Sequence, residues 1–109
     1  MTSNVADSGI TMLVGKAAEL GAAVLKEKTP QAARAYIGWI AELDPAVYRP
    51  AEGELELALN LAVTDMLGAD LRPNQQSSNY AFFRGVAKIY GLGGLVKEYT
   101  AEIAKLDSR

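Results

Sequence analysis

Apolar residues recur at helical spacing along almost the whole chain, and this periodicity constrains the fold more than any other feature. Strict alternation, which is typical of strands, occurs only at residues 54–57, inside a longer helical pattern. We therefore predict an all-α protein, a compact bundle of four main helices plus one short helical turn. In the first helical segment the apolar stripe consists of Ile10, Leu13, Val14, Ala17, Gly21, Val24 and Leu25.

Capping residues, prolines and glycines divide this pattern into elements. Thr29-Pro30 ends the first helix and begins the second, since Thr is a good N-cap and Pro suits the first helical position. Asp44-Pro45 opens one further turn. The third helix, at about 51–67, is apolar on most of its faces and is predicted to be central. The polar segment 69–78 is predicted to be a loop, with Ser77 or Ser78 capping the next helix, and helical spacing resumes after residue 93.

The length of 109 residues and the 50% hydrophobic content indicate one folded domain, which we place at residues 9–109. Residues 1–8 are predicted to be a flexible N-terminus. The longest apolar stretch, residues 9–25, is interrupted by Lys16 and Glu19 and is too polar to span a bilayer. We expect a cytoplasmic protein with no membrane partner.

The absence of both cysteine and histidine excludes several classes of site. Disulfides, thiol nucleophiles, zinc fingers and Ser-His-Asp machinery all need one of these residue types. Glu52, Glu54 and Glu56 are interpreted as a solvated helix start, because helical side chains two positions apart point in nearly opposite directions. We therefore predict no catalytic residues, no metal, no cofactor and no enzyme activity.

Two glycine motifs resemble nucleotide-binding loops only superficially. Between Gly9 and Gly15 there are five residues where a phosphate loop needs four, and Ala17 follows Lys16 where the loop needs Ser or Thr. Residues 91–94 are better explained as a helix stop and restart, in which glycine supplies positive φ.

Charge is distributed unevenly although the formal net charge is only −2. Residues 42–70 carry seven acidic side chains and one basic, whereas residues 71–109 carry six basic and three acidic. This asymmetry favours either internal complementarity or a surface for a partner. The first three helices also have more apolar perimeter than a small monomer easily buries, which predicts a homodimer.

An aromatic and basic surface is the best candidate for binding, because aromatic and arginine side chains are the commonest anchors of interfaces. Phe82 and Phe83 are adjacent, so only one of them can face the core fully. The predicted interaction residues are Trp39, Tyr80, Phe83, Arg84 and Lys88.

We thus expect a non-enzymatic protein-interaction or regulatory module, such as an adaptor, inhibitor or assembly factor. One alternative is a helical bundle with a pocket for a small apolar ligand. A second is a helix-turn-helix-like nucleic-acid binder that reads DNA with residues 78–90. The ten-residue loop before that helix and its many aromatic residues argue against nucleic acid.

Overall fold

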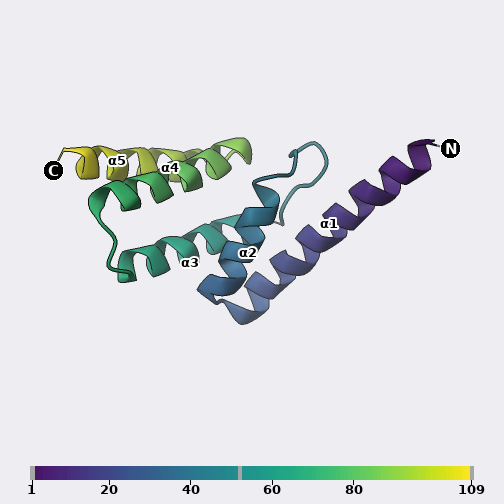
Figure 1. Ribbon diagram of the computed structural model, residues 1–109, viewed down its shortest axis with the longest axis horizontal. Coiled ribbons are helices and arrows are strands. Elements are labelled where there is room, and N and C mark those ends of the chain that lie inside the picture. The colour runs from purple at the N-terminus through teal and green to yellow at the C-terminus, as the bar shows by residue number, and fades with distance from the viewer. Residues whose placement is uncertain (1, 52, 109) are drawn as a thin grey trace.

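The computed structural model describes the backbone of residues 2–51 and 53–108, and the side chains of residues 11–51 and 53–108. This part of the chain contains no strand and forms five helices (Figure 1). They are α1 (Thr2–Glu27), α2 (Pro30–Ile40), α3 (Glu54–Gly68), α4 (Pro73–Ile89) and α5 (Gly93–Asp107). The all-α prediction is confirmed, but there is one helix more than the four main helices expected. The short turn lies where it was predicted, after Asp44, whose carbonyl accepts from the N–H of Val47 at 2.8 Å.

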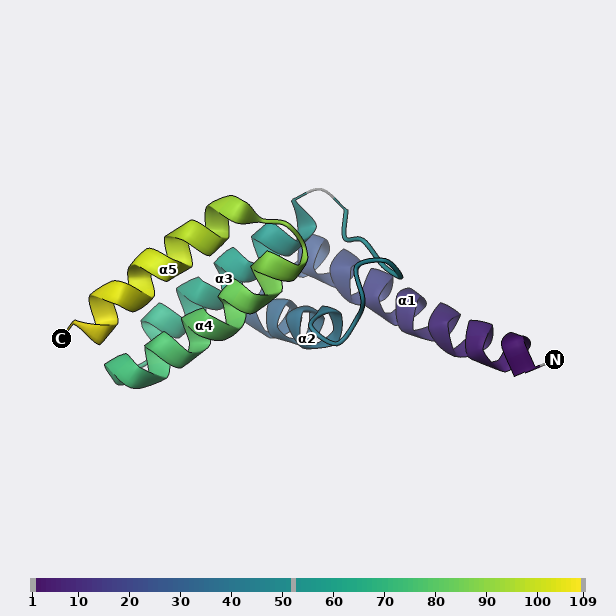
Figure 2. The ribbon, with the colours of Figure 1, turned by 90° about the horizontal axis from the view of Figure 1, so that it is seen from above.

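The helices are arranged as an elongated body with one long arm. Its radius of gyration is 15.3 Å, against about 13 Å for a compact domain of this length. α4 and α5 form an antiparallel pair, α3 packs beneath α4, and α2 lies between α3 and α1 (Figures 1 and 2). The first half of α1 projects away from the other helices. α3 contacts α1, α2 and α4, so the prediction that it is central is confirmed.

Local signals explain where most helices begin and end. The Thr29 hydroxyl accepts from the N–H of Ala32 at 3.2 Å, and Pro30 occupies the first turn of α2, as predicted. Gly91 has φ +76° and separates α4 from α5, also as predicted. α1 begins at Thr2, so Asn4 and Asp7, the two N-caps that the sequence suggests for this helix, both lie inside it. The flexibility of residues 1–8 stays a prediction, and Met1 lies outside the described residues.

The predicted loop at 69–78 is wrong beyond residue 72, because α4 begins at Pro73. Proline at the first helical position is a start signal, and Gln75 adds another by accepting the N–H of Arg72 at 2.9 Å. Ser77 then donates to the Asp107 carboxylate at 3.1 Å, which ties this polar turn to the end of α5. The α3–α4 connection is therefore four residues long, and the loop-length argument against a helix-turn-helix no longer holds.

The core contains side chains from all five helices. Its largest fully buried members are Tyr36, Tyr99, Ile37, Ile40, Leu59, Met66 and Val24. Tyr90 connects the end of α4 to the end of α2, since its hydroxyl donates to the Ile40 carbonyl at 2.8 Å. Among the described residues no helix is long and apolar enough to cross a bilayer.

Candidate functional site

The five predicted interaction residues do not form one surface. Tyr80 and Phe83 are buried, with ring centroids 5.6 Å and 6.4 Å from that of Tyr99 on α5. Their expected exposure is incorrect, because α5 covers the side of α4 from which both project. One of the two adjacent phenylalanines is exposed, as expected, but it is Phe82. The sequence alone does not show which of the two phenylalanines is exposed, because this depends on where α5 packs.

Trp39 lies in an open apolar groove of about 470 Å³ between α1 and α2. The groove is lined by Leu13, Arg34, Ala35, Gly38, Trp39, Glu42 and Leu43. A second hollow on the other side of α2 is lined by Arg34, Ile37, Gly38, Asn79, Phe82 and Phe83. Both hollows share Arg34 and Gly38, so they adjoin each other along α2.

We call the residues Leu13, Ala35, Gly38, Trp39 and Phe82 the α2 surface. Its three large side chains are 41%, 37% and 48% exposed for Leu13, Trp39 and Phe82 respectively. A Cβ atom added at Gly38 would meet nothing within 4 Å, so the middle of the surface is open to an approaching backbone. Three helices therefore contribute to one exposed apolar strip.

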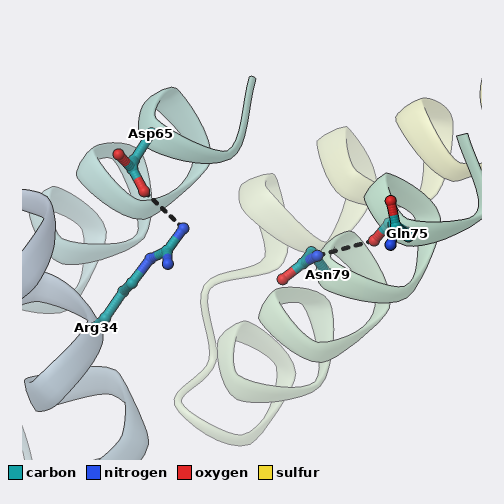
Figure 3. A network of polar contacts seen from close by, with 4 residues as sticks. All are labelled: Arg34, Asp65, Gln75 and Asn79. Carbon is teal, nitrogen blue, oxygen red and sulfur yellow. Dashed lines mark hydrogen bonds and ion pairs between the residues drawn. The ribbon is translucent and has the colours of Figure 1, made fainter. Parts of the chain in front are cut away.

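Arg34, which lines both hollows beside the α2 surface, is paired, whereas Glu42, which lines the Trp39 groove, is in neither ion pair of the described residues. Arg34 Nη2 lies 2.6 Å from Asp65 Oδ2 on α3, so the guanidinium points from α2 toward α3 (Figure 3). Asn79 is held on the other side, where its amide donates to the Gln75 carbonyl at 2.8 Å within α4. Glu42 therefore leaves one acidic side chain at the edge of this surface.

Arg84 and Lys88 line a different hollow, of about 620 Å³, between α4 and α5. Arg84 Nη1 lies 3.4 Å from the hydroxyl of Thr100, which in turn donates to the Val96 carbonyl at 2.7 Å. Within residues 11–51 and 53–108, no carboxylate lines this groove. The structure therefore separates the aromatic and the basic parts of the predicted surface.

Glu54 corrects part of the interpretation of the acidic cluster as a solvated helix start, whereas Glu56 is exposed as expected and Glu52 lies outside the described residues. Glu54 is only 5% exposed, and its Oε2 accepts from the hydroxyl of Tyr36 at 2.5 Å and of Tyr48 at 3.3 Å. Burial first, and then the hydrogen bond to Glu54, raise the pKa of Tyr36 far above its ordinary value. The described residues contain no group of three metal-ligating side chains. This closed cluster joins α2 and the start of α3.

Tyr99 carries a buried hydroxyl with no hydrogen-bond partner within the described part of the chain. Burial raises the pKa of this phenol, and the charge of Glu98 raises it further. A buried hydroxyl without a partner costs about 1–3 kcal/mol of stability. We therefore expect Tyr99→Phe to increase the free energy of unfolding by about 1 kcal/mol in urea titrations followed by circular dichroism.

The matched control for Tyr99→Phe is Tyr90→Phe, which removes a hydroxyl that does donate, to the Ile40 carbonyl at 2.8 Å. We expect this variant to lose about 1 kcal/mol. If both variants lost stability equally, the Tyr99 hydroxyl would have a partner in solution.

Comparison with known proteins assigns no relative: no family model, no curated protein and no solved structure matches this chain.

Proposed function

We propose that this chain is a non-enzymatic interaction module that self-associates through the α2 surface. The observation that supports the proposal is the apolar strip of Leu13, Trp39 and Phe82 across α1, α2 and α4. Aromatic side chains at the centre of a hollow are typical anchors of interfaces, and a helix laid into a groove is a common mode of recognition. The lack of histidine and cysteine in the sequence favours a binding role over catalysis.

A second copy of the chain is the occupant that fits this surface, because α1 needs a partner too. α1 has 26 residues, which corresponds to a length of about 39 Å. α1 is therefore longer than the molecule is wide, since the two short dimensions of the molecule are 25 Å and 22 Å. Met12, near the middle of the arm, is 75% exposed. Helical stability in water depends mostly on tertiary packing, so packing of this part of α1 against another copy would stabilise it.

Leu13 suggests how two copies meet. It belongs both to the exposed stripe of α1 and to the lining of the groove beside α2. A two-fold axis close to Leu13 would place α1 of each copy against α2 of the other, which is the isologous arrangement of most homodimers. The open backbone at Gly38 and the small side chain of Ala35 would allow the two helices to approach closely.

Light scattering over a wide concentration range tests this proposal. We expect a mass of about twice the 11.6 kDa of one chain. Leu13→Glu introduces a charge into the proposed interface, and we expect it to weaken dimerisation by at least ~100-fold. A monomer at every concentration, or a Leu13→Glu variant that dimerises like the wild type, would overturn self-association.

Leu67→Glu is the matched control for Leu13→Glu. Leu67 is a leucine on α3 with 55% exposure, and it lines neither hollow of the α2 surface. We expect this variant to dimerise as the wild type does. Circular dichroism of both variants checks that helix content is retained.

A further inference from the structure

The groove between α4 and α5 combines two cations with an apolar wall, and we infer that it binds a small phosphate monoester that carries an apolar group. Arg84 and Lys88 lie one helical turn apart on α4, and Leu92 and Val96 form the wall on α5. A volume of about 620 Å³ is within the usual range for small-molecule sites.

Among the described residues, no carboxylate forms an ion pair with either cation of the groove. The ion pairs of the described residues are Arg34–Asp65 and Lys105–Glu102, and neither includes Arg84 or Lys88. Like charges four positions apart on a helix repel, so an anion bound between them would relieve this repulsion. The two hollows beside α2 differ, because the arginine there already contacts Asp65.

The charge of the site fits a phosphate monoester. Such a group carries close to two negative charges near neutral pH and three acceptor oxygens. Arg84 offers a planar fork of donors that matches phosphate geometry, and Lys88 adds a second positive charge.

The shape of the groove leaves room for the rest of the ligand. Gly85 lies on the wall between the cations, and a Cβ there would meet nothing within 4 Å. The contact of Arg84 Nη1 with Thr100 Oγ1, at 3.4 Å, keeps the guanidinium directed across the groove. An apolar group attached to the phosphate would then lie along Leu92 and Val96, on the wall that faces the two cations.

Titration with phenyl phosphate, followed by amide chemical shifts, tests the inference. We expect saturable shifts at Gly85, Gly91 and Val96, and weaker binding of inorganic phosphate and of phenol, which each lack one half of the ligand. Arg84→Gln and Lys88→Gln are each expected to weaken binding of phenyl phosphate by about tenfold. The matched control is Lys97→Gln, which removes an exposed lysine of α5 outside the groove and leaves binding unchanged.

Several results would overturn the inference. They are shifts that do not saturate, shifts that map to another face, and affinity that is unchanged in both Arg84→Gln and Lys88→Gln. Equal affinity for inorganic phosphate and for phenyl phosphate would show that the apolar wall does not contribute to binding. Displacement of phenyl phosphate by a short DNA duplex at lower concentration would instead assign the groove to nucleic acid. None of these variants touches the α2 surface, so their effects are separable from dimerisation.

Discussion

Gly21→Ala will destabilise the protein by about 2–4 kcal/mol, although the same substitution usually stabilises a helix. A Cβ atom at this position of α1 would lie 2.5 Å from both Cδ and Oε1 of Glu54. The carboxylate has no room to retreat, because it is buried and hydrogen-bonded to Tyr36 at 2.5 Å. Moving it breaks that bond and leaves the buried Tyr36 hydroxyl without its partner, which is a costly change.

Gly15→Ala provides the matched control on the same helix. A Cβ at Gly15 would meet nothing within 4 Å, and its φ is not in the left-handed region. We expect it to raise the free energy of unfolding by about 0.5–1 kcal/mol. Urea unfolding of both variants, followed by circular dichroism, should therefore give shifts of opposite sign.

A double-mutant cycle identifies Glu54 as the cause. In a Glu54→Ala background the new methyl group has nothing to displace, so Gly21→Ala should cost nothing there. We expect a coupling free energy of at least about 2 kcal/mol between the two positions. Additive effects would mean that Gly21→Ala acts by some route other than the carboxylate.

The contacts of Glu54 also show why some of this structure could not be predicted from the sequence. Apolar periodicity, Thr29-Pro30 and Gly91 are local signals, and the elements that depend on them were predicted correctly. The partners of Glu54 lie on α1, on α2 and in the segment after α2, and no spacing along the chain brings them together. A glutamate in a run of three acidic residues looks solvated until its tertiary neighbours are known.

The candidate binding residues also fall into two groups, those that the sequence predicts correctly and those whose exposure depends on helix packing. Trp39, Arg84 and Lys88 line hollows at the surface, because their helical positions leave them outside the core. Tyr80 and Phe83 share an amphipathic pattern with the exposed residues, and only the packing of α5 on α4 decides which side is covered. The start of α4 is a separate case. Pro73 is a local signal for a helix start, but the polar composition of residues 69–78 predicted a loop there.

Raising the pH from 10 to 12 will lower the free energy of unfolding by about 5 kcal/mol. All five tyrosines of the chain have a pKa raised above 10, and burial is the largest cause for each. In the unfolded chain these phenols ionise near pH 10, whereas in the folded protein they keep their protons. The resulting stability is fully present below pH 10 and is lost as the pH rises above it.

The size of this effect follows from proton linkage. Each phenol that stays protonated only in the folded state removes about 1.4 kcal/mol per pH unit above 10. Tyr36 and Tyr99, the two most deeply buried, together give a slope of about 2.7 kcal/mol per pH unit. Small domains have only about 5–15 kcal/mol of stability, so this slope is sufficient to unfold them.

The measurement is phenolate absorbance and far-ultraviolet circular dichroism on the same alkaline titration. Because the folded state protects its phenols, we expect phenolate to appear in one step that coincides with the loss of helix. A gradual phenolate signal that starts near pH 10 while the helices persist would show that the tyrosines are accessible to hydroxide, and would contradict the expectation.

Two phenylalanine variants separate this linkage from ordinary stability. Tyr36→Phe loses the hydrogen bond to Glu54. We therefore expect this variant to be less stable than the wild type by about 2 kcal/mol at neutral pH. Tyr99→Phe loses no such bond and is expected to be more stable there. Each variant also lacks one linked proton, so the stability of each should fall less steeply above pH 10, by about 1.4 kcal/mol per pH unit. The deficit of Tyr36→Phe relative to the wild type should therefore shrink in alkali, while the advantage of Tyr99→Phe should grow.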